Sequence, residues 1–334
     1  MISRRTFLGG IGVLALIPTG LVLQGCASDA KAQEGPLTVH LGEQSVYGGI
    51  VFSYAKEVGI LDDVLKGSDV SVDIADFNGG PAMNEAFASG QLDFALMGNL
   101  PAFTGVASDY GYTIVATAQR SDKWGAIVAA RQAGVSSLDE LPGKRIGTVI
   151  GGSWHYAAGL FLKKAGLEFP DVQLVNTASE TASSIRSGAI DAGMVSEAVA
   201  YQLVADGSAV LLDDAPGEPT FQAVCASEGL VSQHPDVTAL LIKTVDATLR
   251  YQDEHLEDYL AFYQEKTGAD PEPVRATWEL QERAAKIPAA TEDEASENML
   301  QWMKDNGITA NTAIQPDELF DLGPAQDAGL AASA

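Results

Sequence analysis

The chain alternates between short apolar runs and longer stretches in which apolar residues recur at helical spacing. The first apolar runs have the length of strands and cover residues 37–41, 70–77 and 93–97. Helical patterns lie between them at residues 49–58 and 81–89. Strands that alternate with helices of about ten residues predict right-handed crossovers and a mainly parallel sheet. This first stretch is therefore predicted to be one α/β unit.

The same order of elements recurs farther along the chain. Apolar runs cover residues 145–150, 172–175 and 190–195, again separated by helical patterns. Ser153 is predicted to cap the first helix of this stretch and Gly166 to end it. The pattern thus predicts a second α/β unit.

A sequence repeat links the two units. Residues 89–98 and 187–196 both read Ser-Gly, any residue, Leu or Ile, Asp, and then an apolar run. With the same spacing Asn78 falls on Asn176, each at the end of an apolar segment. Internal similarity of several elements in the same order predicts two lobes of like construction.

Composition excludes one class of partner. The 334 residues include 45 Asp and Glu but only 20 Lys and Arg, for a net charge of −25. A surface of this sign repels nucleic acid, so we expect no nucleic acid partner. Cys225 is the only cysteine after Cys26, and a single thiol forms no intramolecular bridge. Stability must come from buried cores, and about 300 residues suffice for two domains.

The first 26 residues have the pattern of an export signal. Arg4 and Arg5 precede an apolar stretch from Ile11 to Leu23, and Cys26 follows. Glycine and proline interrupt this stretch, which is shorter than the about 20 apolar residues that span a bilayer. The segment resembles a twin-arginine leader joined to a bacterial lipobox, with export by Tat or Sec left open. The resemblance implies cleavage, acylation of Cys26 and a lipid anchor that holds the exported protein at the cell surface or in the periplasm.

Three further segments differ from the two α/β units. Residues 27–36 are small and polar and are predicted to be a tether. Residues 321–334 are similar and are predicted to be a disordered tail. After Pro235 the pattern is mostly helical, with Val237 and Leu241 on one face, and predicts helices packed on the first unit.

Four blocks of sequence carry a resemblance to a known family. They are Asp-Phe-Asn-Gly-Gly-Pro-Ala-Met-Asn-Glu-Ala at 76–86, Gly-Asn-Leu-Pro-Ala at 98–102, Leu-Pro-Gly-Lys-Arg-Ile-Gly at 141–147 with Gly-Ser-Trp-His-Tyr at 152–156, and Gln-His-Pro-Asp-Val at 233–237. In content and order these blocks resemble the nitrate, sulfonate and taurine group of periplasmic binding proteins. The resemblance covers residues 37–320.

The resemblance implies a type II periplasmic binding protein fold, with two lobes joined by two hinge strands. It assigns residues 37–118 and 221–320 to lobe one and residues 119–220 to lobe two. Polar or Pro- and Gly-rich residues at 120–123 and 216–219 stand where hinges are needed. It further implies a monomeric solute-binding protein of an ABC importer, with permease and ATPase subunits as partners and no cofactor.

In such sheets ligands lie beyond the carboxyl ends of the strands, where loops lead into helix N-termini. Free amides and the helix dipole favour an oxyanion there. Gly79 and Gly80 provide one such end in lobe one, and Ser153 provides one in lobe two, unless these residues only form turns and a cap. By the resemblance, His155 borders the ligand. The candidate ligand-binding residues are Gln44, Ser45, Tyr47, Asn78, Gly79, Gly80, Gly98, Asn99, Ser153, Trp154, His155, Ser196 and Glu197.

The pair Ser196 and Glu197 departs from the family pattern. Sulfonate binders of this group commonly carry a tryptophan, an acidic residue and a proline at this point, whereas this chain keeps only the acid. Glu197 at a helix start is either a dipole partner or a pocket residue suited to an amine. The resemblance implies an aliphatic sulfonate or taurine as the solute, and taurine would suit a pocket that Glu197 enters. Because of this departure, nitrate, an aromatic acid or a pyrimidine stay as alternatives.

An enzyme and a ligand-sensing lipoprotein are the rival interpretations. Relatives that make a thiamin pyrimidine carry a cysteine-rich motif that this chain lacks, and its four histidines show no metal-ligand spacing. No serine stands in a nucleophile elbow. Asp191 corresponds to Asp93 in the repeat, which favours a structural role over an acid-base role beside His155. We expect no catalytic residue and no metal.

Overall fold

The computed structural model describes residues 36–44, 49–177, 180–287, 294–309 and 311–332, which belong to one compact unit. The predicted signal segment with Cys26, nearly all of the tether, and the candidates Ser45 and Tyr47 lie outside the described residues. None of the described helices is long and apolar enough to cross a bilayer.

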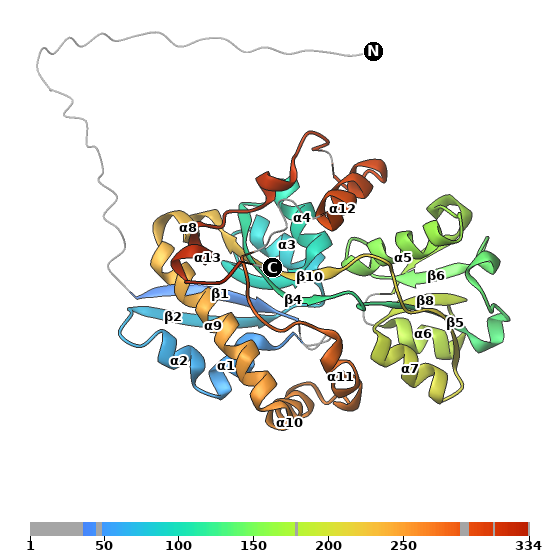
Figure 1. Ribbon diagram of the computed structural model, residues 1–334, viewed down its shortest axis with the longest axis horizontal. Helices are drawn as coiled ribbons and strands as arrows, with labels where there is room; N and C mark the ends of the chain where they lie inside the picture. The colour runs from blue at the N-terminus through green and yellow to red at the C-terminus, as the bar shows by residue number, and fades with distance from the viewer. Residues whose placement is uncertain (1–35, 45–48, 178–179, 288–293, 310, 333–334) are drawn as a thin grey trace, which may run out of the picture. The chain divides into compact units, whose positions relative to one another are not determined.

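The first sheet contains five strands in the order β2-β1-β3-β10-β4 (Figure 1). Their bounds are β1 Leu37–Glu43, β2 Val70–Asp76, β3 Phe94–Gly98, β4 Tyr112–Ser121 and β10 Thr220–Ser227. Strand β1 pairs in parallel with β2 and β3, whereas β10 runs antiparallel to both of its neighbours. The mainly parallel sheet that the pattern predicts is confirmed, with one reversed strand.

The second sheet repeats this arrangement in the order β7-β6-β8-β5-β9. Its strands are β5 Ala126–Ala130, β6 Arg145–Thr148, β7 Gln173–Asn176, β8 Ala192–Val195 and β9 Ala209–Asp213. Again the strand fourth in order, here β5, is antiparallel to its neighbours while β6 pairs in parallel with β7 and β8. We call the first sheet with its helices lobe one and the second lobe two. The chain crosses between them at residues 122–125 and 214–219.

Helices flank both sheets. Those of lobe one are α1 Val51–Glu57, α2 Ile60–Val64, α3 Gly80–Ala88 and α4 Asn99–Ala107, and those of lobe two are α5 Ser153–Lys164, α6 Thr181–Ser187 and α7 Glu197–Ala205. The Ser-Gly pair of the repeat ends α3 and α6. Gly90 and Gly188 have φ angles of 69° and 74°, in the left-handed region that glycine adopts without strain.

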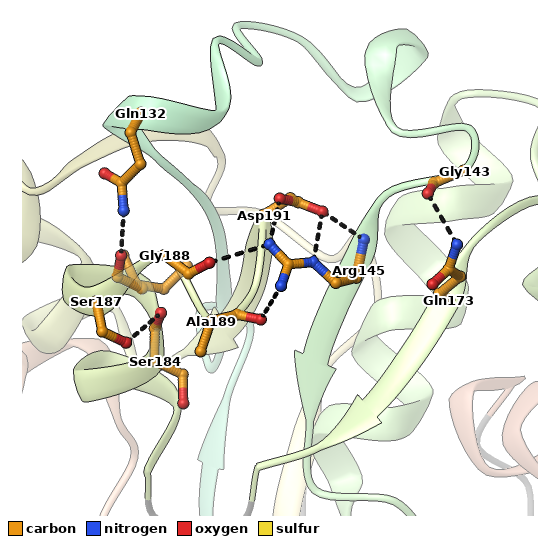
Figure 2. Close-up of polar contacts among 10 residues, drawn as sticks. Gln132, Gly143, Arg145, Gln173, Ser184, Ser187, Gly188, Ala189 and Asp191 are labelled. Atoms are coloured by element: carbon orange, nitrogen blue, oxygen red, sulfur yellow. Dashed lines mark hydrogen bonds and ion pairs between the residues drawn. The ribbon is translucent and has the colours of Figure 1, made fainter.

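The aspartate of the repeat anchors β1 in lobe one and β6 in lobe two, which occupy the same place in the two repeats. Asp93 Oδ2 accepts the backbone N–H of His40, and Asp191 Oδ2 accepts that of Arg145, both at 2.9 Å. Figure 2 shows that the Arg145 guanidinium also reaches Asp191, with Nη2 2.8 Å from Oδ1. These hydrogen bonds lower the pKa of Asp191 below its usual value. The structural role expected for Asp191 is confirmed.

The C-terminal part is helical, as its pattern predicts. It comprises α8 Glu228–Gln233, α9 Pro235–Glu254, α10 Leu256–Thr267, α11 Glu272–Ala276, α12 Glu294–Asp305 and α13 Gly323–Asp327. Helix α9 contacts α1 and α2, and its Val237, Leu241 and Val245 belong to the core of lobe one. Helix α9 therefore packs on lobe one, as predicted.

The prediction of a disordered tail from residue 321 is wrong for residues 321–332. Helix α13 contacts α9, with Ala325 fully buried, and Ile287 pairs with Ala332 as a short parallel bridge. Small residues made this segment resemble a flexible tail. Their size instead lets the helix lie close against α9.

Candidate ligand site at three helix N-termini

Four helices begin at the carboxyl ends of strands. Helices α3 and α4 follow β2 and β3 in lobe one, and α5 and α7 follow β6 and β8 in lobe two. This placement results from the parallel order of those strands, because each crossover starts at the same edge of its sheet. The sequence prediction put most of its candidate residues at these four points, and Gln44, Ser45 and Tyr47 after β1.

The N-termini of α3, α4 and α5 lie against one another. Gly80 begins α3 and Pro101 lies in α4, and a methyl group at Gly80 would lie 2.3 Å from Pro101 Cγ. A methyl group at Gly98 would lie 2.3 Å from Oγ of Ser153, across the two lobes. One at Gly151 would lie 3.6 Å from Cγ of Pro81. Glycine at 80 and 98 is thus required for this close approach, and Gly79, with φ of 108°, leads into α3.

Asn99 is the polar centre of this junction. Its side chain is 2% exposed, and Oδ1 accepts hydrogen bonds from the Leu100 N–H at 3.0 Å, Ser153 Oγ at 3.0 Å and Thr220 Oγ1 at 3.1 Å. In these three hydrogen bonds Asn99 is the acceptor. Its side chain also carries an N–H2 group, which is the kind of donor that suits an anionic ligand.

Ser153 does not cap its helix, contrary to the sequence prediction. The cap residue of α5 is Gly152, and Ser153 is the first residue of the helix. Its hydroxyl is therefore turned to Asn99 in lobe one instead of to its own backbone. Sequence reasoning identified the residue but missed its partner. Thr220, the third member of this cluster, carried no signal beyond its place after a Pro-rich hinge.

Trp154 lies beside the first crossing between the lobes. Its Nε1 donates to the carbonyl of Trp124 at 3.4 Å, and a methyl group at Gly125 would lie 3.6 Å from its ring. Trp124 in turn donates from Nε1 to the carbonyl of Glu218 in the second crossing, at 2.6 Å. The sequence prediction missed Trp124 and Glu218. Helix α5 thus contacts both crossings.

His155 belongs to α5, and its ring packs against Phe169 and Trp302. The ring is 6% exposed and lies 4.9 Å from the Phe169 ring and 5.4 Å from the Trp302 ring, measured between centroids. Its Nδ1 accepts only the Gly151 N–H, at 3.4 Å. Burial lowers the pKa of His155 below its usual value. The residue is therefore a packing residue in this structure.

Ser196 and Glu197 begin α7. Ser196 Oγ accepts the Val199 N–H at 3.4 Å and caps the helix. Glu197 is 3% exposed, its Oε1 has no hydrogen-bond partner among the described atoms, and burial raises its pKa. The carboxyl group lies near the first crossing, because the Gly125 backbone is among its hydrogen-bonding neighbours.

The remaining candidates of lobe one are divided. Gln44 is 9% exposed, and its Nε2 donates to the Leu96 carbonyl at 3.4 Å and to Met83 Sδ at 3.7 Å, which ties it to the core. Asn78 is exposed just before α3.

Two cavities, one bordered by Leu37 and His234 and the other by Tyr112 and Asn311, do not include the Asn99 junction. Among the described residues no group of three or more His, Cys, Asp or Glu is placed to hold a metal ion.

Comparison with known proteins identifies relatives of the whole described unit. A family model described as "ABC transporter, phosphonate, periplasmic substrate-binding protein" matches residues 58–235, more than half of the chain. A Bacillus subtilis protein named as an aliphatic sulfonates-binding protein is 25% identical over 270 residues, covering 79% of this chain and 80% of its own.

Two solved structures show how widely the fold is shared. The alkanesulfonate-binding protein SsuA from Xanthomonas axonopodis, bound to MOPS, superposes with a TM-score of 0.76 at 17% identity, over 86% of this chain and 99% of its own. The desulfurization enzyme DSZB superposes with a TM-score of 0.62 at 15% identity, over 87% and 98%. At these identities the structures establish the two-lobed fold alone, which confirms the periplasmic binding protein fold predicted from the sequence.

Proposed function

Because the chain belongs to the family of ABC transporter periplasmic substrate-binding proteins that the phosphonate model describes, we propose that it binds a small sulfonate between its lobes. Membership makes it an exported solute-binding protein that serves the permease and ATPase of an importer. The observation that carries the proposal is the junction of α3, α4 and α5 around Asn99, with donors from both lobes.

The junction offers the groups that an oxyanion needs. Helices α4 and α5 direct free backbone N–H groups and the positive end of their dipoles toward their first residues, Asn99 and Ser153. The Ser153 hydroxyl, which donates to Asn99 Oδ1 in this structure, is a neutral donor. The N–H2 group of the Asn99 side chain is a second one. Neutral donors suit a monoanionic sulfonate better than a dianionic phosphonate, since a second buried charge without a cation costs more desolvation energy.

Binding requires the lobes to separate and close again. In this structure Ser153 and Asn99 bond directly to each other, so a ligand would replace that contact with its own oxygen atoms. The crossings at residues 122–125 and 214–219 are the segments about which the lobes would rotate. Ligand contacts from both lobes would then favour the closed state.

A thermal-shift screen tests the proposal. The panel contains ethanesulfonate, taurine, methylphosphonate, nitrate, benzoate and a pyrimidine, each at rising concentration. A ligand at one hundred times its Kd adds about 2.7 kcal/mol to the free energy of unfolding, so we expect the sulfonates to raise the melting temperature most. Stabilisation by methylphosphonate and not by ethanesulfonate would replace sulfonate by phosphonate as the solute. No stabilisation by any anion would refute an anion site.

We further propose that the protein acts by binding alone, although an enzyme shares its fold. Cys225 is fully buried in β10, and burial raises its pKa, so its thiol is a poor nucleophile. Incubation with each stabilising ligand, followed by mass spectrometry of the small molecules, should recover the ligand unchanged. Release of sulfite or any other product would identify an enzyme.

The lipid anchor is a separate proposal. Cys26 follows an apolar leader in the sequence, which supports acylation and retention at the membrane. A bacterial host that expresses the full chain should retain it in the membrane fraction, and Cys26→Ala should release it. Equal release of both forms would argue against the anchor.

A further inference from the structure

Helix α12, Glu294–Asp305, lies beside α4 of lobe one (Figure 1) and also contacts α5 of lobe two through Trp302. On one side it contacts α4 and the short helix Pro316–Leu319, and its Met299, Leu300 and Met303 are buried. Lys304 Nζ also donates to the Ile314 carbonyl at 2.9 Å. Helix α12 therefore packs against α4 of lobe one and against residues 314–319.

A neighbouring side of α12 carries Trp302, whose ring packs against residues of α5 in lobe two. The Trp302 ring is 5.1 Å from the Tyr156 ring, 5.4 Å from His155 and 6.0 Å from Phe169, between centroids. A methyl group at Gly159 would lie 2.6 Å from Trp302 Nε1. Only glycine at this position of α5 allows the indole to approach so closely.

A polar contact next to the ring reaches the second crossing. Asn298 Nδ2 donates to Glu218 Oε1 at 3.2 Å, and the Tyr156 hydroxyl donates to Glu218 Oε2. Helix α12, the crossing at residues 214–219 and α5 are thus joined through one carboxylate.

We infer that α12 is a strap that holds α5 of lobe two against lobe one, with Trp302 as a positioning residue for ligand binding. Ser153 begins the helix on which Trp302 rests, so contacts of the strap fix where Ser153 stands relative to Asn99. Opening of the lobes must separate Trp302 from α5 or detach α12 from lobe one. The strap therefore biases the protein toward its closed state before any ligand arrives.

The inference rests on the proposed function for its meaning, but its first test needs no ligand. Small-angle scattering of the full chain, purified without sulfonate buffers, compares the parent with Trp302→Ala, Gly159→Ala and Gly229→Ala. Gly229 lies in α8 with open space where a methyl group would go, so it is a matched helical control. We expect a larger radius of gyration for Trp302→Ala and Gly159→Ala than for the parent and Gly229→Ala.

The double variant Gly159→Ala with Trp302→Ala separates the strap from general destabilisation. Without the indole, Phe169 Cζ at 3.3 Å is the neighbour that remains of the three nearest atoms, a contact that a small shift relieves, so the double variant should lie close to Trp302→Ala alone. Unchanged radii in both single variants, an equal change in Gly229→Ala, or fully additive effects in the double variant would overturn the inference.

A second measurement connects the strap with binding. A fall in the closed fraction from about one half to about one tenth raises the apparent Kd about fivefold, so we expect this loss of ethanesulfonate affinity in Trp302→Ala. An unchanged Kd together with a larger radius would contradict the positioning role. If ethanesulfonate does not bind the parent, the proposed function fails while the scattering comparison still decides the strap.

Discussion

Single residues at the junction have distinct tasks. Asn99 gathers the hydroxyl donors of both lobes, Ser153 supplies the donor from lobe two, and His155 packs behind the same helix. Adjacent residues of α5 therefore face different surroundings, because successive positions of a helix point about 100° apart. His155 therefore packs against Phe169 and Trp302 instead of joining the Asn99 cluster, although it lies only two residues after Ser153.

Replacement of Ser153 by Ala should weaken sulfonate binding by about tenfold to a hundredfold, since a hydrogen bond to a charged group contributes about 1.5 to 3 kcal/mol. The melting temperature of the ligand-free protein should fall only modestly, because Ser153 is not a helix cap and Asn99 Oδ1 keeps its hydrogen bonds from Leu100 and Thr220. Isothermal titration checks the affinity. Ser187→Ala, at the exposed end of α6, serves as the control. Equal Kd values for both variants would exclude Ser153 from the site.

His155 should make stability depend on pH below neutrality. Burial lowers its pKa in the folded state, so the unfolded chain binds the proton first as the pH falls through 6.5. The free energy of unfolding should decrease from that point down to the folded pKa and then level off. His155→Phe keeps a ring against Phe169 and Trp302 and should lack this decrease. Urea unfolding at pH 7.5 and 5.5 measures both, and parallel pH profiles would contradict the assignment.

Equivalent helices of the two lobes differ at their N-termini. Helix α1 follows β1 as α5 follows β6, but Glu43 fills the N-terminus of α1. Its Oε2 accepts the N–H groups of Phe52 and Ser53 at 3.0 Å each. At α5 no acidic side chain takes that place in the described structure, and the cap is Gly152. An internal carboxylate thus occupies the N-terminus of α1 in lobe one, whereas the equivalent N-terminus in lobe two is the one proposed to receive the anionic ligand.

Glu43→Ala should destabilise the protein by about 1 to 3 kcal/mol, because it leaves two buried N–H groups without an acceptor. Chemical denaturation measures the loss. Glu57→Ala, an exposed change at the other end of α1, is the control and should have little effect. Ethanesulfonate affinity should stay unchanged in both. A neutral result for Glu43→Ala would show that water replaces the carboxylate.

At the level of the whole chain, the C-terminal helices pack against both lobes. Helix α13 covers α9 of lobe one, α11 contacts α7 of lobe two, and α12 bridges α4 and α5. Among the described residues, no strand after β10 joins the second sheet. The part of the chain after β10 therefore contacts lobe two by packing and not by strand pairing. The C-terminal helices therefore contact both of the lobes that are proposed to close on a ligand.

Truncation after Phe320 should lower the free energy of unfolding by about 2 kcal/mol, because it uncovers the apolar surface of α9 beneath Ala325 and Ala328. A disordered tail would give no loss. Urea unfolding of the truncated and full chains measures the difference. Truncation after residue 332 is the control, since it keeps the pairing of Ile287 with Ala332.

The sequence by itself determined the two α/β units, their repeat and the four places where helices begin after strands. These features arise from local rules: apolar periodicity, Gly90 and Gly188 as helix ends, and the recurring Asp93 and Asp191. Only the tertiary structure decided which helix ends meet. The contact of Ser153 with Asn99, the burial of His155 by Trp302 and the packing of α13 join residues far apart in the chain, and no local pattern encodes such distances.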